Sequence, residues 1–231
     1  MQISYEQFYL NTVAVKTQIS AACERAHRDT DSVELLAVTK NHPAIAAEFA
    51  ARFGLRAVGE NRVQEGVAKR AECKAQIAWE LIGHLQSNKA KLASAHFDRI
   101  QSVDSTKLID LLNRAASERQ RVLPILLQIN AGRDEAKFGA DIEDAESLME
   151  HALSLASLRV DGLMTIAPLS GDRDVARRCF ATLRELRDRL AQRSGTPLAT
   201  LSMGMSGDLS EAIEEGSTQV RIGTALFGAR V

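Results

Sequence analysis

The sequence has few cysteines and almost no net charge, and each shortage excludes a class of protein. Its 231 residues contain three cysteines, far apart and in no C-x-x-C arrangement, which argues against a disulfide framework and against a zinc site. The 29 Lys and Arg residues nearly balance 30 Asp and Glu residues, so the chain lacks the positive excess of most nucleic-acid-binding proteins. We therefore expect a reducing compartment and no nucleic-acid partner.

Long apolar segments are also missing. No apolar run approaches the roughly 20 residues that are needed to span a bilayer. The first twenty residues mix Gln2, Glu6, Asn11 and Lys16 among the apolar ones, which is unlike a secretory signal. We expect a cytoplasmic protein that does not contact a membrane.

Short apolar runs alternate with segments of helical periodicity along the chain. The runs are typical of strands buried on both faces, and the predicted strands are 34–39, 56–58, 77–82, 97–103, 122–129, 159–163, 199–202 and 219–222. The predicted helices are 4–27, a helix after Pro43, 63–74, 87–95, 105–119, 141–156, 172–192 and 208–215. Pro124 lacks an N–H group, so pairing in its strand must begin after it or be irregular.

This alternation predicts an α/β fold with eight βα units. A single (β/α)8 TIM barrel and a doubly wound open sheet share the pattern. The barrel is favoured because its usual length is roughly 250 residues, with a lower limit near 200, and because no G-x-G-x-x-G follows the first strand. We expect one domain, 1–231, in which an extra N-terminal helix, within 1–30, packs on the barrel.

Chemically unusual residues collect after the predicted strands, where barrels place their active sites. They are Lys40, Gly59 to Asn61, Gly83, His84, Asp104, Ser105, Asn130, Lys137, Thr165, Ser202 to Gly207, Gly223 and Thr224. The opposite strand ends carry Arg56, Arg99, Arg121 and Arg159, which we expect to be ordinary surface residues. One rim of the barrel is therefore the candidate site.

Lys40 is the candidate with the most specific chemistry. A lysine at a strand end is usually a solvated charge. At a barrel mouth, however, partial desolvation lowers the pKa of the amine and lets it attack an aldehyde to form a Schiff base.

The glycine-rich stretches after the last two strands are candidates for phosphate binding. Glycines in loops are commonly simple turns, but these lie where barrels bind phosphate. Ser206 can donate its hydroxyl to an anion or cap the following helix, whereas Asp208 and Glu211 would compete with an anion there. The stretch after Gly223 lacks the Lys and Ser/Thr of a nucleotide P-loop.

Other motifs are weaker. His84 and Asn61 are candidates for contact with a ligand ring, although a loop histidine is as often a structural hydrogen-bond donor. The five histidines show no H-x-x-x-H spacing, so we predict no metal site. Ser206 has no partners for a hydrolase triad.

Strings at the predicted strand ends resemble those of the pyridoxal phosphate homeostasis protein family. They are LLAVTK ending at Lys40, VGENRVQE from Val58, WELIGHLQSNKAK from Trp79, SVDS from Ser102, QINAGRDEAKFG from Gln128, GLMTIAP from Gly162, and LSMGMSGDLSEAIEEGSTQVRIGTALFG from Leu201. Only the amino-terminal helix lacks a signature. The resemblance implies the fold of the alanine racemase barrel domain, which is fold type III of pyridoxal phosphate (PLP) proteins, and PLP as cofactor.

The same resemblance implies how PLP is held. Lys40 would carry it as a covalent aldimine, and Ser206 with the backbone of Gly223 and Thr224 would hold its phosphate. The roles of Lys137 and His84 stay open.

The resemblance also implies which residues surround the cofactor ring. Arg221 would face the pyridine nitrogen, and Asn61 and Met203 would line the ring. PLP acts as an electron sink when this nitrogen is protonated. An arginine keeps its own proton, so Arg221 would leave the nitrogen unprotonated and weaken the sink.

Racemase chemistry needs a second acid or base, which alanine racemases draw from a C-terminal domain and a dimer partner. This sequence ends shortly after the last predicted strand, and we expect no such domain. We therefore predict a monomeric, non-catalytic PLP carrier or regulator in vitamin B6 homeostasis, without catalytic residues and with apo-enzymes as recipients. The alternative is a PLP-dependent amino-acid racemase or a related enzyme, and Lys40 serves both hypotheses.

Overall fold

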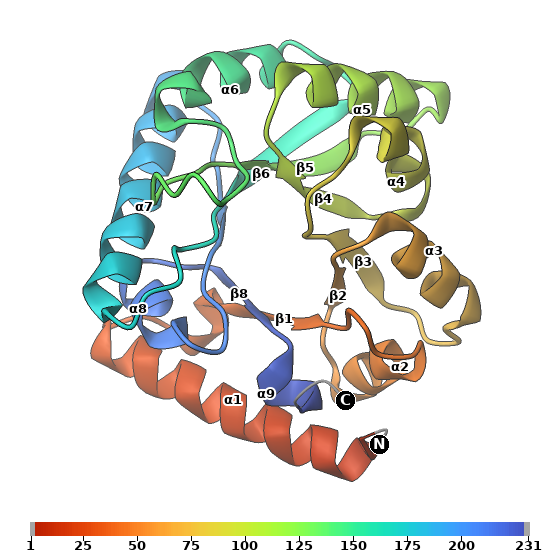
Figure 1. The fold of residues 1–231 in the computed structure, drawn as a ribbon, viewed down its shortest axis with the longest axis vertical. Helices are drawn as coiled ribbons and strands as arrows, with labels where there is room; N and C mark the ends of the chain where they lie inside the picture. The colour runs from red at the N-terminus through yellow and green to blue at the C-terminus, as the bar shows by residue number, and fades with distance from the viewer. Residues whose placement is uncertain (1–2, 229–231) are drawn as a thin grey trace.

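Residues 3–228, which the computed structural model describes, form a closed barrel of eight parallel strands (Figure 1). The strands are β1 (Glu34–Val38), β2 (Ala57–Glu60), β3 (Ala78–Leu81), β4 (Arg99–Val103), β5 (Leu123–Gln128), β6 (Leu158–Met164), β7 (Thr200–Ser202) and β8 (Gln219–Ile222). β8 pairs with β1, so no edge stays open. The predicted barrel is confirmed and the open sheet is wrong. Residues 1 and 231, the predicted domain limits, lie outside the described residues.

Helices enclose the barrel. They are α1 (Tyr5–Arg25), α2 (Ile45–Phe53), α3 (Val63–Glu72), α4 (Ala90–His96), α5 (Thr106–Glu118), α6 (Ala145–Leu153), α7 (Arg173–Ser194), α8 (Leu209–Glu214) and α9 (Thr224–Phe227). Short 3₁₀ turns occupy Thr30–Ser32, Ser87–Lys89 and Ile142–Asp144, so the predicted helix 141–156 begins with a tighter turn. No helix among residues 3–228 combines the length and apolarity that crossing a bilayer requires.

Strand geometry separates two apolar layers. Successive side chains of a strand point to opposite faces, so Leu36 and Val38 pack inside the barrel, whereas Leu35 and Ala37 join the main core under the helices. Lys40 continues the inward series and reaches the mouth of the barrel, where it lines a cavity.

The amino-terminal helix α1 packs along α8 and α9 (Figure 1). Ser4 caps it by accepting a hydrogen bond from the Gln7 N–H. Phe8 stacks on Phe227 with ring centroids 5.1 Å apart, and the Asn11 amide donates to the Leu226 carbonyl at 2.9 Å. α1 therefore supports the segment that follows β8.

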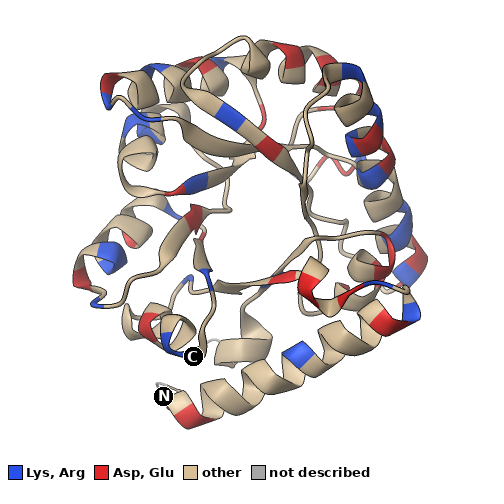
Figure 2. Cartoon of the chain, turned by 180° about the vertical axis from the view of Figure 1, so that it is seen from behind, with Lys and Arg blue, Asp and Glu red and all other residues tan. Residues whose placement is uncertain are grey.

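Charged positions lie mostly on the helices and loops around the barrel, but a few lie on the strands (Figure 2). Arg99 and Glu80 form an ion pair at 2.8 Å, with side chains only 15% and 7% exposed. The expectation that Arg99 is an ordinary surface residue is therefore wrong. Its side chain points inward because Arg99 lies two positions before Gln101 on the same face of β4.

Pairing between β5 and β6 is irregular. Pro124 lies inside β5 opposite Arg159, and the register shifts between Ile125 and Leu126, as the proline led us to expect. Opposite this shift, Gly162 adopts a φ of +158°, and a Cβ at this position would lie 1.9 Å from the Thr200 carbonyl oxygen. Only glycine lets β6 and β7 approach this closely.

An ionic cluster of Glu60, Glu65 and Lys69 holds the backbone on both sides of Lys40. The Lys69 ammonium donates to Glu60 at 2.8 Å, to Glu65 at 2.6 Å and to the Thr39 carbonyl at 2.7 Å. The Asn41 N–H donates to Glu65, and the Thr39 hydroxyl donates to Glu60 at 2.6 Å. Burial raises the pKa of Glu60, and its hydrogen bonds with Lys69 and Thr39 oppose that rise.

We expect Gly162→Ala to destabilise the protein by about 3 kcal/mol, because the added methyl group meets a carbonyl that cannot move without distorting the sheet. Urea unfolding measures the loss. Gly171→Ala is the matched control, since a Cβ there meets nothing within 4 Å. Equal stability of the two variants would contradict the close approach of β6 and β7.

We expect Lys69→Met to lower the free energy of unfolding by about 3–5 kcal/mol, because it leaves the fully buried Glu60 without its cation. Part of this loss should return as the pH falls, since a protonated Glu60 has no charge to compensate. Lys91→Met, which breaks an exposed pair with Glu118, should change stability by less than about 1 kcal/mol. If urea unfolding showed equal losses of stability for Lys69→Met and Lys91→Met, the charge of Lys69 would not stabilise the buried Glu60.

Candidate functional site

A cavity of about 490 Å³ opens at the carboxyl ends of the strands. Six of the seven predicted cofactor residues line it, and these are Lys40, Asn61, Ser206, Arg221, Gly223 and Thr224. They come from the ends of β1, β2, β7 and β8 and from the segments that follow. The structure thus brings together residues that are up to 184 positions apart in the sequence.

The cavity favours an anion. Among the described residues that line it, none is Asp or Glu, whereas Lys40 and Arg221 contribute basic groups. A positive site with low-dielectric walls attracts negative charge more strongly than the open surface does.

Arg221 sits in the wall of this cavity and is 4% exposed. Its Nη1 donates to the Ser202 carbonyl at 2.6 Å and to the Ser202 hydroxyl at 2.8 Å, and its Nη2 donates to the Thr165 carbonyl at 2.8 Å. Burial lowers the pKa of Arg221 to about 10, against the opposing effect of Asp208. The side chain is therefore a fixed cation at neutral pH that offers only donors.

The loop between β7 and α8 is shaped by its own acidic residue. The Asp208 carboxylate accepts the Met205 N–H at 2.6 Å, and burial raises the pKa of Asp208 while this hydrogen bond opposes the rise. Glu211 accepts a hydrogen bond from Arg173 at 3.2 Å. The predicted competition with an anion is thereby reduced, because both carboxylates have partners. Ser206 is exposed in the same loop and lines the cavity.

Glycines bring two backbone segments close to the cavity. A Cβ at Gly83 would lie 2.2 Å from the Asn61 carbonyl oxygen, so the segments that follow β2 and β3 touch directly. A Cβ at Gly223 would approach the Val38 carbonyl at 3.3 Å, which is a tight contact. A larger residue at either position would push these backbone segments apart, so both glycines permit the close approach.

Met203 differs from expectation. Its side chain is fully buried in the main hydrophobic core and is not among the residues that line the cavity. The reason is strand alternation, since Ser202 points into the barrel and its neighbour points out. Met205, further along the loop, lines the cavity instead.

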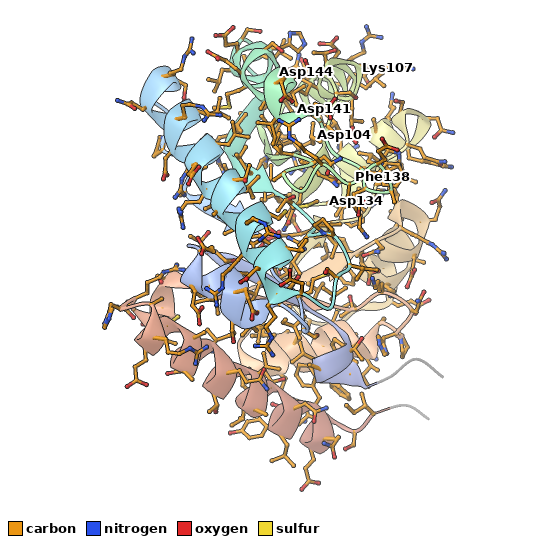
Figure 3. The ribbon with its side chains drawn as sticks, turned by 60° about the vertical axis from the view of Figure 1, so that its left-hand side comes forward. Asp104, Lys107, Asp134, Phe138, Asp141 and Asp144 are labelled. Carbon is orange, nitrogen blue, oxygen red and sulfur yellow. The ribbon has the colours of Figure 1, made fainter. Side chains whose placement is uncertain are left out.

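The sequence interpretation missed Phe138 and Gln128, which also line the cavity. Phe138 is 59% exposed and stacks on His84 with ring centroids 3.9 Å apart, and the Gln128 amide donates to the Phe138 carbonyl at 2.9 Å. His84 Nδ1 lies 3.7 Å from Asp104, which belongs to the same side of the molecule as Phe138 (Figure 3). The only available signal was an aromatic residue in the predicted loop after the fifth strand.

Within residues 3–228, no group of three or more His, Cys, Asp or Glu side chains is placed to hold a metal ion. Lys137, the other lysine singled out in the loops, is not among the residues that line the cavity. The amine in the cavity is therefore that of Lys40.

Comparison with known proteins bears on this geometry. Residues 10–231 match the family model of the alanine racemase N-terminal domain. The pyridoxal phosphate homeostasis protein of Pseudomonas aeruginosa is 42% identical, covering 95% of this chain and 94% of the relative. That of Aquifex aeolicus is 41% identical, covering 94% and 95%.

Solved structures share the fold of this chain. PipY of Synechococcus elongatus with PLP bound is 38% identical, has a TM-score of 0.84, and covers 96% of this chain and 100% of its own. An alanine racemase of Clostridium difficile shares the fold at 13% identity, with a TM-score of 0.75 over 93% of this chain and 56% of its own. By fold, family model and curated relatives, this chain belongs to the pyridoxal phosphate homeostasis protein family.

Proposed function

We propose that this protein binds PLP and acts as a carrier or regulator of its supply, without robust catalysis. The observation that carries the proposal is a cavity in which Lys40 and Arg221 are both present and whose lining, within residues 3–228, contains no acidic side chain. Relatives that share about two fifths of the sequence are named for PLP homeostasis, and PipY has a structure with PLP bound.

The chemical groups of PLP match the donors of the cavity. The amine of Lys40 would replace the aldehyde oxygen of PLP, with release of water, to give a Schiff base. The phosphate would lie against the Ser206 hydroxyl and the segment Gly223 to Thr224, which is the phosphate position of barrels. Asn61 would lie beside the ring.

The ring nitrogen of PLP would face Arg221, and this contact argues against strong catalysis. When bound, PLP supplies an electron sink that is strongest with a protonated ring nitrogen. Arg221 is a donor and a cation, so it disfavours a proton on that nitrogen. An amino-acid racemase is the competing function, and turnover measurements distinguish the two.

We expect the protein with added PLP to show a visible absorption band that Lys40→Ala abolishes. Borohydride reduction followed by peptide mapping should place the pyridoxyl label on Lys40, because this is the lysine that lines the cavity. Lys107→Ala, an exposed lysine of α5, is the control and should keep the band. Label found mainly on Lys137 would refute the assignment.

We expect little exchange of amino-acid Cα hydrogen when the PLP-loaded protein is incubated with amino acids in deuterated water, because Arg221 weakens the electron sink. Mass spectrometry measures the exchange. Transfer of PLP to an apo-enzyme, followed through the activity that the recipient regains, should proceed. Robust deuterium incorporation with any amino acid would establish the racemase alternative.

A further inference from the structure

A polar cluster crosses the interior of this barrel, from β3 and β4 to β7 and β8. TIM barrels are normally filled by branched apolar side chains. Here Glu80, Gln101, Ser202, Gln219 and Arg221 all point inward and are at most 5% exposed. Buried polar groups without partners are destabilising by roughly 1–3 kcal/mol each, so such a cluster needs continuous hydrogen bonding.

The hydrogen bonds form one chain from the amino-terminal side of the barrel to the cavity. Arg99 donates to both oxygens of Glu80, at 3.0 and 2.8 Å. The Gln101 amide nitrogen donates to Glu80 and to the Gln219 side-chain oxygen, the latter at 2.7 Å. The Ser202 hydroxyl donates to the Gln101 oxygen at 2.6 Å and accepts from Arg221 at 2.8 Å.

The charge at one end fixes the direction of every donor in this chain. Both Glu80 oxygens act as acceptors, so the Gln101 amide must turn its NH₂ group toward Glu80 and its oxygen toward Ser202. A flipped amide would set its oxygen against the carboxylate. The Ser202 hydroxyl then has to donate to Gln101, which keeps its lone pairs directed at Arg221.

Arg221 is held in one orientation as a result. Both Nη1 hydrogens point at Ser202 and one Nη2 hydrogen points at Thr165. The guanidinium has two further N–H hydrogens, on Nε and Nη2, that can donate to a ligand in the cavity that Arg221 lines. Rotation of the planar guanidinium would break all three bonds.

We propose that Gln101 is a positioning residue that, through the Ser202 hydroxyl, fixes the direction in which Arg221 presents its N–H groups to the PLP ring nitrogen. The inference rests on the proposed function, since it takes PLP as the occupant of the cavity. Gln101 does not line the cavity. Asp208, Glu80, Glu34 and Arg99 are charged side chains around this path, and Lys40, His42 and His84 are the titratable groups that line the cavity with Arg221.

The test follows the protonation of the ring nitrogen by ¹⁵N NMR of labelled PLP bound to the full-length protein over a range of pH. In Gln101→Met and in Ser202→Ala, a loosened Arg221 should let the ring nitrogen take a proton at a pH higher by about 0.5 unit, roughly a threefold change in the protonation equilibrium. Ser202→Ala removes a single atom, so it serves if Gln101→Met does not fold.

A double variant separates action through Ser202 from a general effect on packing. With Ser202→Ala already present, Gln101→Met should shift the titration no further, because the path is already broken. Gln219→Met and Ser94→Ala are the controls. The first leaves the links from Glu80 to Arg221 in place, and the second removes a buried hydroxyl of α4. Both should titrate like the parent protein.

Additive shifts in the double variant, an unchanged titration in both single variants, or an equal shift in Gln219→Met would overturn the positioning role. These outcomes are separate from failure of the proposed function. If the parent protein shows no bound PLP signal, the proposed function itself fails. If the parent binds PLP but Gln101→Met and Ser202→Ala titrate as the parent does, the role of Gln101 fails and the proposed function stands.

Discussion

The positive charge of Arg221 inside the barrel is the constraint on which much of the surrounding structure depends. An ion moved from water into a protein interior loses solvation worth several kcal/mol even after relaxation. The hydrogen bonds to Ser202 and Thr165 and the nearby Asp208 carboxylate replace that solvation. Two of these hydrogen bonds go to backbone carbonyls, but the third needs the Ser202 hydroxyl, and that hydroxyl in turn needs the polar side chain of Gln101. This part of the barrel interior therefore cannot use the usual apolar filling.

The barrel itself was predictable because few folds are compatible with eight short apolar runs that alternate with helical segments. Side chains of a strand alternate between its two faces, so recognising β1 is enough to place Lys40 at the mouth of the barrel. The polarity of the barrel interior was harder to predict, since neither Arg99 nor Glu80 belongs to a recognisable motif. Their pairing depends on the register between β3 and β4, which no local pattern encodes. A charge between Trp79 and Leu81 in a buried strand was the one available signal.

The cavity residues were predictable where they follow a strand directly, as Asn61 and Gly223 do. Met203 was named from the family resemblance rather than from the strand pattern, and in the structure its side chain lies in the main core, not in the cavity lining. Phe138 was missed because it belongs to a long loop after β5. A loop has no hydrophobic periodicity that would indicate where a side chain points. Its stacking on His84 arises from the meeting of two loops whose paths are set by the barrel.

The ionic cluster around Lys69 has a thermodynamic consequence for ligand binding. Thr39 and Asn41 are held on either side of Lys40, so folding already removes the backbone freedom of this segment. Ordering a flexible residue costs about 1–2 kcal/mol in conformational entropy. A ligand that reacts with Lys40 therefore meets a preorganised loop, and most of the entropy still to be lost on binding is that of the lysine side chain and of the ligand.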